Sequence, residues 1–262
     1  MSAPPDRGRM RRNLLWLGGI ALAYGALASG PNLWRRVFPA AFDFSEIPGL
    51  PGFRRIGQGA VSAGSPVLIG LDAGAPAPPR AAPGELRADL CAHLFGGAIG
   101  TGAVPVAYFS DVRCSYCRVL TPLVHERSSG AAASIRLAWH ELPLLGESSV
   151  LAARAALAAG FQGAGPAIHA RLAATRLVPT QAALVRLAED IGIDGARLVA
   201  DMAAPRVDRQ LAVSLGLAGL FGFPGTPALV VGRTAVLGRI EAGDLDRLIA
   251  LEAAEAATAP CA

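Results

Sequence analysis

The sequence predicts an α/β domain that is interrupted by a helical subdomain and preceded by an N-terminal membrane segment. Three observations support this prediction. Short runs rich in β-branched and aromatic residues, typical of buried strands, occur at 104–109, 135–142, 228–231 and 234–237. Apolar residues recur with a helical period between the second and third of these runs. An uncharged apolar stretch lies near the start of the chain.

The N-terminal stretch combines a basic flank with an apolar run. Residues 7–12 carry four arginines, and the apolar heart that follows extends over residues 14–28. This pattern is typical of a short membrane anchor or a secretory signal peptide. An anchor is favoured for residues 1–30. Cleavage after residues 26–28 and a buried soluble helix are the alternatives. Both main interpretations place the rest of the chain in the periplasm or at the extracytoplasmic face.

Residues 31–84 are rich in proline, glycine and alanine. This composition predicts a spacer of limited order, with a short strand at 67–69. A small packed subdomain is the alternative. The main domain is then expected over residues 85–262.

Regular elements follow one another through the main domain. Apolar residues at every fourth position predict a helix over 85–95. A second helix is expected after residue 114, with a kink at Pro122. The inserted helical subdomain is expected at about 145–218. A helix over 241–257, with acidic residues near its start, closes the domain.

The segment CSYC at 114–117 lies where a predicted strand turns into a predicted helix. A cysteine at a helix N-terminus meets unpaired N–H groups and the positive end of the helix dipole, which lower its pKa. We therefore expect Cys114 to be the attacking sulfur and Cys117, one turn later, the resolving one. Zinc commonly uses this spacing too, but the sequence has no second such pair, and neither His93 nor His125 lies in a ligand pattern.

Thr226 and Pro227 precede the third predicted strand. Proline cannot donate a ladder hydrogen bond, so its position here indicates a special turn. Together with Cys114 and Cys117, the turn is similar to the cis-proline loop of thioredoxin-fold proteins. In that loop the residue before the proline leaves its backbone free to pair with a substrate chain. An ordinary trans proline that opens a strand is the alternative.

Three segments resemble the DsbA-like family of exported thiol–disulfide oxidoreductases: YFSDVRCSYC, SVLAARAALAAG and GFPGTPALVVGR. The resemblance extends over about residues 85–257. It implies a thioredoxin-like fold with an inserted helical subdomain, and it places Cys114, Cys117 and Pro227 in the matching positions. No cofactor is expected beyond the redox-active disulfide between Cys114 and Cys117.

Two features depart from the strong oxidants of that family. Ser115-Tyr116 replaces the Pro-His pair that is common among them, and this dipeptide resembles isomerase-type ones. Thr226 likewise resembles the isomerase side of the family. However, isomerases of the family dimerise through an N-terminal domain, and residues 31–84 are too rich in proline for one. A monomeric oxidant is therefore favoured.

Cys91 and Cys261 are the two remaining cysteines. An even number of cysteines in an exported chain predicts a second, structural disulfide between them. The alternative is that Cys91 is a small buried apolar residue and Cys261 a frayed end.

Other polar side chains near the motifs receive structural interpretations. We expect Asp111 to be a solvated loop acid, Glu141 a structural residue, His140 a packed core residue and His169 a surface residue. The net charge of +4 is not arranged as a basic stripe with interleaved aromatic residues, which argues against nucleic-acid binding.

The sequence therefore predicts a protein that forms or exchanges disulfides. Its expected substrates are unfolded or reduced exported proteins, and a membrane redox partner is expected to recycle its cysteine pair. An isomerase or reductase kept reduced by a membrane donor is one alternative. A metal-handling or assembly factor that uses the cysteines as ligands is another.

Overall fold

The computed structural model describes Trp16 and residues 40–57, 59–64, 79–96, 102–175, 180–256 and 261. The predicted membrane segment over 1–30 lies outside the described residues apart from Trp16, and the strand expected at 67–69 lies outside them entirely. Within the described ranges, no helix combines the length and the apolar character needed to cross a membrane. Residues 43–262 form one compact unit.

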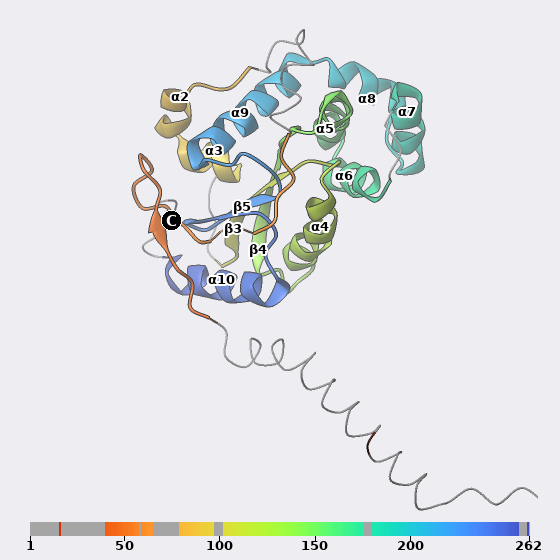
Figure 1. The fold of residues 1–262 in the computed structure, drawn as a ribbon. Helices are drawn as coiled ribbons and strands as arrows, with labels where there is room; N and C mark the ends of the chain where they lie inside the picture. Colours follow the sequence, from red (N-terminus) through yellow and green to blue (C-terminus); the bar gives the residue numbers. More distant parts are fainter. Residues whose placement is uncertain are drawn as a thin grey trace, which may run out of the picture. The chain divides into compact units, whose positions relative to one another are not determined.

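A mixed sheet forms the centre of this unit, with β3, β4 and β5 in its middle in the view of Figure 1. In the described residues it has six strands in the order β1–β2–β6–β5–β3–β4. The strands are β1 (Ser45–Glu46), β2 (Arg54–Arg55), β3 (Val104–Ser110), β4 (Ile135–Glu141), β5 (Ala228–Val231) and β6 (Thr234–Leu237). β3 runs parallel to β4 and antiparallel to β5, while β5 and β6 form an antiparallel hairpin. The four strands predicted from the sequence are thus adjacent in the sheet.

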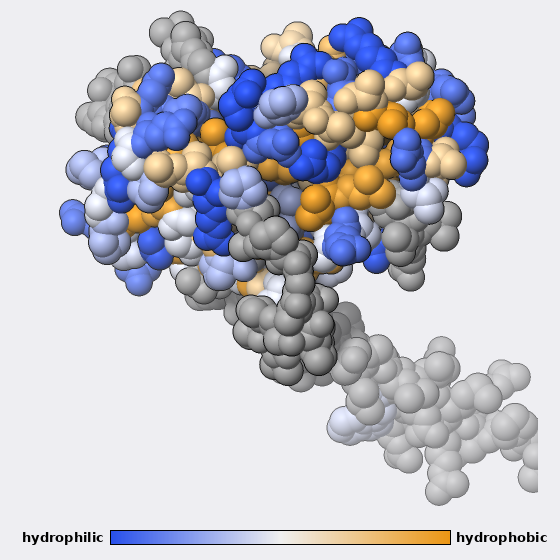
Figure 2. Space-filling model, turned by 90° about the horizontal axis from the view of Figure 1, so that it is seen from above, coloured by the Kyte–Doolittle hydropathy of each residue, from blue (hydrophilic) through white to orange (hydrophobic). Residues whose placement is uncertain are grey.

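Helices cover the sheet and form the insertion (Figure 1). They are α2 (Pro83–Ala88), α3 (Leu90–Phe95), α4 (Ser115–Ser128), α5 (Glu147–Gly160), α6 (Gly165–Ala174), α7 (Gln181–Asp190), α8 (Gly195–Met202), α9 (Pro205–Phe221) and α10 (Ala242–Ala254). α5 to α8 surround an alanine- and leucine-rich core of their own, and α9 leads back towards β5. Figure 2 views the molecule from above and shows apolar side chains between hydrophilic ones on that surface.

β3 lies between β5 and β4 in the sheet and is buried on both faces, as its nearly continuous apolar sequence predicts. Ala107 and Phe109 join the main core with residues of α2, α3 and α9. Tyr108 points to the opposite face, where its hydroxyl lies 3.0 Å from the Thr121 hydroxyl on α4. The carboxyl end of β3 leads into α4, and the start of β5 pairs beside it, with Phe109 opposite Ala228. This pairing brings the two sequence motifs together.

The prediction of a spacer of limited order over 31–84 is wrong for the residues around β1 and β2, which the structure describes. β1 and β2 extend the sheet, with β2 parallel to β6. Ile47, Leu50 and Phe53 are buried in the main core. A few large apolar residues between proline- and glycine-rich turns are therefore enough to attach this segment to the domain, because each removes a large apolar area from water.

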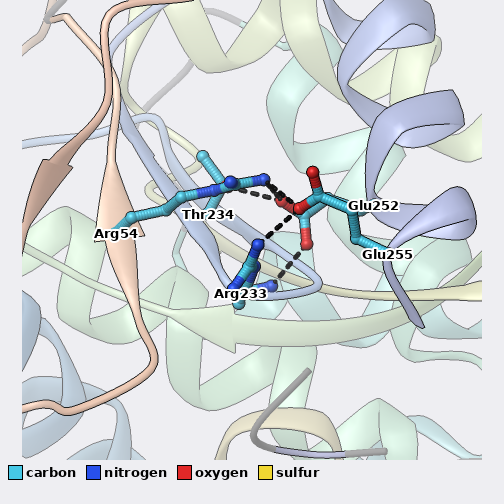
Figure 3. Close-up of polar contacts among 5 residues, drawn as sticks. All are labelled: Arg54, Arg233, Thr234, Glu252 and Glu255. Carbon is cyan, nitrogen blue, oxygen red and sulfur yellow. Dashed lines mark hydrogen bonds and ion pairs between the residues drawn. The ribbon is translucent and has the colours of Figure 1, made fainter. Parts of the chain in front are cut away.

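A polar cluster fastens β2 to the other end of the domain (Figure 3). Arg54 on β2 donates to Glu252 and to Glu255, at 2.8 Å each. Glu252 is buried and also accepts from the Thr234 hydroxyl at 2.6 Å and from the Arg233 backbone N–H at 2.9 Å. These charge-assisted bonds hold β2, β6 and the end of α10 in one arrangement.

The last described residue is bonded covalently to α3. Cys91 and Cys261 form a disulfide with an S–S distance of 2.01 Å and a Cα–Cα distance of 5.5 Å. Cys261 is buried against the main core. The bond joins the end of the chain to the first helices of the domain.

Candidate active site

Cys114 caps the N-terminus of α4. Its sulfur accepts a hydrogen bond from the backbone N–H of Cys117 at 3.1 Å, and in the thiol form it donates to the carbonyl of Thr226 at 3.3 Å. Both cysteines have free thiols and are buried, with exposed fractions of 0% for Cys114 and 1% for Cys117. The structure thus brings Cys114, Cys117 and Thr226 into direct contact.

The two thiols have opposite acidities. The hydrogen bond from the Cys117 side chain, helped by one from Ser62, lowers the pKa of Cys114 from 9.0 to about 6, although burial opposes the shift. Burial raises the pKa of Cys117 far above its ordinary value, and its hydrogen bond to Cys114 adds to the increase. At neutral pH the pair therefore carries one negative charge, on Cys114. This is the arrangement expected of an attacking sulfur and a protected partner.

Alkylation of the reduced protein should reveal this acidity. We expect the rate at Cys114 to rise with pH to a plateau, with a midpoint near pH 6, because only the thiolate attacks. The pKa of Cys114 is lower in the folded reduced protein than in the unfolded chain. Between about pH 6 and pH 9 the folded form therefore binds fewer protons than the unfolded chain, and the free energy of unfolding rises with pH. Mass spectrometry of iodoacetamide-treated protein measures the rate. A midpoint near pH 9 at Cys114 would contradict this prediction.

The peptide bond between Thr226 and Pro227 is cis. Thr226 is fully buried beside Cys114, and its backbone forms an isolated antiparallel bridge with Ser62. Ser62 donates to the Thr226 carbonyl at 2.7 Å, and the Thr226 N–H donates to the Ser62 carbonyl at 2.8 Å. Sequence reasoning missed Ser62, because nothing in its glycine- and alanine-rich surroundings indicates a site.

Asp111 was expected to be a solvated loop acid, and that prediction is wrong. Its exposed fraction is 1%, and its carboxylate accepts four hydrogen bonds. The donors are the backbone N–H groups of Arg113, Leu144 and Leu145 and the hydroxyl of Ser149. Asp111 thus fixes the loop before Cys114 to the start of α5. The bond from the Arg113 N–H to the Asp111 side chain, two residues earlier, makes an Asx turn. The tendency of aspartate to form such turns is the signal in the sequence for this structural role.

The surface position expected for His169 is also wrong. His169 is buried, and its Nδ1 donates to Glu141 at 2.7 Å while its Nε2 lies 3.1 Å from the Ser110 hydroxyl. Glu141 therefore joins the end of β4 to α6, a structural role. His140, expected in the core, is buried and stacks on Phe109. Burial lowers the pKa of His140 to about 4.

Arg118 has a structural role beside the cysteine pair. Arg118, next to Cys117, donates to the Ala173 carbonyl at 2.7 Å and so connects α4 to α6. A groove of about 920 Å³ lies between α3, β4 and α9, and none of the predicted site residues lines it. Within the described part of the chain, no three His, Cys, Asp or Glu side chains are grouped as metal ligands.

Comparison with known families places the chain in one of them by more than half its length. Residues 105–250 match the family described as DSBA-like thioredoxin domain. The matched segment exceeds half of the 262-residue chain. It contains both active-site cysteine candidates and the Thr226–Pro227 turn.

Solved structures with the same architecture include a thioredoxin-like oxidoreductase from Silicibacter pomeroyi DSS-3. It is 36% identical, covers 61% of this chain and 95% of its own, and has a TM-score of 0.55. A periplasmic thioredoxin-like protein from Salmonella enterica serovar Typhimurium is 26% identical over 63% and 97%, with a TM-score of 0.55. The thiol-disulfide exchange protein alpha-DsbA2 from Wolbachia pipientis is 18% identical over 64% and 94%, with a TM-score of 0.57. The predicted thioredoxin-like fold is confirmed.

A curated relative matches a shorter stretch. The Na(+)/H(+) antiporter NhaA 3 of Salinispora tropica is 33% identical over 130 residues, which are 49% of this chain. The aligned residues make up only 20% of the antiporter, so the chain spans about a fifth of the relative's length.

Proposed function

The chain belongs to the family of DSBA-like thioredoxin domains, and from this premise we propose that it is a thiol–disulfide oxidoreductase that oxidises pairs of thiols in exported proteins through Cys114 and Cys117. The observation that supports this proposal is the contact of a low-pKa sulfur, a buried partner sulfur and the cis-proline turn. Cys114 and Cys117 are proposed as the reacting residues. Thr226 and Pro227 are proposed to position the client chain.

The proposed reaction has two steps. A client thiolate attacks Cys114 of the oxidised pair, which forms a mixed disulfide and releases the Cys117 thiolate. A second client thiolate then attacks the client sulfur of that bond and releases the Cys114 thiolate. The client loses two electrons, and the cysteine pair gains them. An external oxidant must accept these two electrons to restore the pair.

Oxidation is favoured over reduction because of the acidity of Cys114. A thiolate that is stabilised at neutral pH stabilises the reduced pair, and a stable reduced form makes the disulfide a stronger oxidant. The helix N-terminus adds to this stabilisation. Isomerisation or reduction is the second candidate, and Ser115-Tyr116 and Thr226 favour it, because they resemble the isomerase side of the family.

The proposed setting is the extracytoplasmic side of a membrane. One structural relative is described as periplasmic, and disulfides such as the one between Cys91 and Cys261 persist in oxidising compartments. The proposed substrates are reduced or unfolded exported proteins, and a membrane redox protein is the proposed recycling partner. The chain is proposed to act as a monomer.

The reduction potential tests the direction of electron flow. The full chain is equilibrated with mixtures of reduced and oxidised glutathione, and the fraction of oxidised Cys114–Cys117 is measured after acid quenching. We expect a potential above about −200 mV, whereas a value near −270 mV would place the chain among reductases. Oxidation of a reduced two-cysteine peptide is measured in parallel. Faster repair of a scrambled disulfide protein than oxidation of that peptide would favour an isomerase.

A further inference from the structure

The proposed attacking sulfur is closed off from solvent. Cys114 has an exposed fraction of 0%, although its client must reach the sulfur itself. Residues 59–64, here called the strap, lie against it. The Ser62 side chain helps to lower the pKa of Cys114, and the Ser62 backbone is bonded to Thr226.

The strap satisfies both backbone groups of Thr226. The carbonyl accepts from the Ser62 N–H at 2.7 Å and from the Cys114 thiol at 3.3 Å, and the Thr226 N–H donates to the Ser62 carbonyl at 2.8 Å. A backbone N–H forms one strong hydrogen bond. A second chain therefore cannot pair with Thr226 while Ser62 is in place.

The strap is held firmly at its beginning. It continues from β2, which the Arg54 cluster fastens to β6 and α10 (Figure 3). The Gly59 N–H donates to the Leu237 carbonyl at 2.8 Å, and the Arg239 N–H donates to the Ala60 carbonyl at 2.9 Å. These bonds direct the segment from the end of β6 to the cis-proline turn.

Glycines allow the backbones to approach this closely. A Cβ at Gly225 would lie 2.7 Å from the Ser62 carbonyl oxygen, and a Cβ at Gly59 would lie 2.1 Å from the Arg239 carbonyl oxygen. Real Cβ atoms essentially never show such distances. Gly225 thus lets the turn approach the strap at Ser62, and Gly59 lets the start of the strap approach Arg239 after β6.

We propose that the strap acts as an intramolecular cover that occupies the client-strand position on Thr226, and that an extended client chain must replace Ser62 there before disulfide exchange. This proposal rests on the proposed function, because it assigns the Thr226 backbone to client binding. The strap thereby regulates the same cysteine pair. It selects as substrates extended, unfolded segments that can form an antiparallel pair with Thr226.

The composition of the strap suits a replaceable cover. Its single described bridge joins one residue pair, whereas β5 and β6 pair through four. Gly59, Ala60, Ala63 and Gly64 are exposed, and only Val61 packs partly against the core. Segments with few buried apolar contacts open locally at low free energy. Exchange of one antiparallel pair for another would leave Thr226 bonded in both states.

Alkylation rates of the reduced full chain test the cover. Ser62→Pro removes the N–H that bonds Thr226, and we expect the rate at Cys114 at pH 7 to rise about tenfold, because attack no longer awaits opening. Ala63→Pro is the matched control, since Ala63 donates no described backbone bond and a proline there favours the extended conformation that Ser62 already has. Ser62→Ala controls for the lost hydroxyl and should slow alkylation at pH 6, because it raises the pKa of Cys114.

The rates of the variants decide between the outcomes. A faster Ser62→Pro protein, with Ala63→Pro and Ser62→Ala at or below the rate of the unchanged protein, supports the cover. Equal rates for Ser62→Pro and the unchanged protein would overturn it. Oxidation of a reduced peptide is measured separately, with the oxidised form of the unchanged protein and of each variant. Absence of that activity in the unchanged protein as well as in the variants, with the alkylation difference intact, would overturn the proposed function and leave the cover standing.

Hydrogen exchange tests the replacement without changing the strap. In Cys117→Ala protein, the Cys114 thiolate attacks a peptide activated as a thiopyridyl disulfide, which expels pyridine thione and leaves a stable mixed disulfide. In this mixed disulfide we expect the Ser62 amide to lose its protection from exchange. The Thr226 amide should stay protected, because a carbonyl of the peptide now accepts the hydrogen bond from the Thr226 N–H. Continued protection of Ser62 in the mixed disulfide would overturn the proposal.

Discussion

Cys114→Ser is expected to abolish disulfide transfer, whereas Cys117→Ala is expected to leave the protein joined to its client. Serine at 114 provides no redox-active sulfur at the N-terminus of α4, so turnover should fall on the order of 10³-fold or more. In Cys117→Ala protein, the Cys114 thiolate attacks a client that is activated as a mixed disulfide and expels its leaving group. The bond between Cys114 and the client then accumulates, because no Cys117 thiolate is present to attack Cys114 and release the client.

Cys114→Ser protein is measured on the full chain with a reduced two-cysteine peptide, and Cys117→Ala protein with a one-cysteine peptide activated as a thiopyridyl disulfide, whose disulfide accepts the two electrons. Peptide oxidation is followed by mass spectrometry, and mixed disulfides are followed on non-reducing gels. Ser115→Ala is the matched control, because it changes the first turn of the same helix and keeps both sulfurs. A mixed disulfide mapped to Cys117 instead of Cys114 would reverse the proposed roles.

Removal of the Cys91–Cys261 disulfide is expected to be the largest stability change among the cysteine variants. The bond closes a loop with a sequence separation of 170 residues. In the chain-entropy model, such a loop stabilises the folded state by about 5 kcal/mol, and measured losses for native disulfides are about 2–5 kcal/mol. Loss of the bond also frees the buried Cys261 from α3.

Urea unfolding of the oxidised protein measures this loss. Cys91→Ala with Cys261→Ala is compared with the unchanged chain, and the double change avoids an unpaired thiol. Cys114→Ser with Cys117→Ala is the control that removes the other cysteine pair. We expect the protein with Cys91→Ala and Cys261→Ala to unfold at a lower urea concentration than the unchanged chain. The reduction potential of Cys114 and Cys117 should stay similar. An unchanged midpoint, or two thiols that react in the oxidised native protein, would contradict the prediction.

Patterns within short stretches of the sequence were sufficient for β3 to β6, the inserted helices and the two motifs, but not for β1 and β2. β3 and β4 follow from continuous apolar runs, and α5 follows from its alanine-rich helical period. The adjacency of Cys114 and Pro227 came from the resemblance to a family. The pattern of apolar residues did not contain it, because pairing between distant strands is not written in local periodicity.

Burial and pairing between distant segments required the folded chain. Asp111 and His169 have ordinary polar side chains in sequence, and only the packing of α5 and α6 against the ends of β3 and β4 buries them. The segment before residue 64 has the composition of a linker, yet three apolar residues and Arg54 bind it to the sheet. Local propensities set most helices and strands and the chemistry of the sulfurs. The contact of Ser62 with Thr226 arises only in the folded chain, because β2 pairs with β6 and directs the chain across the cis-proline turn.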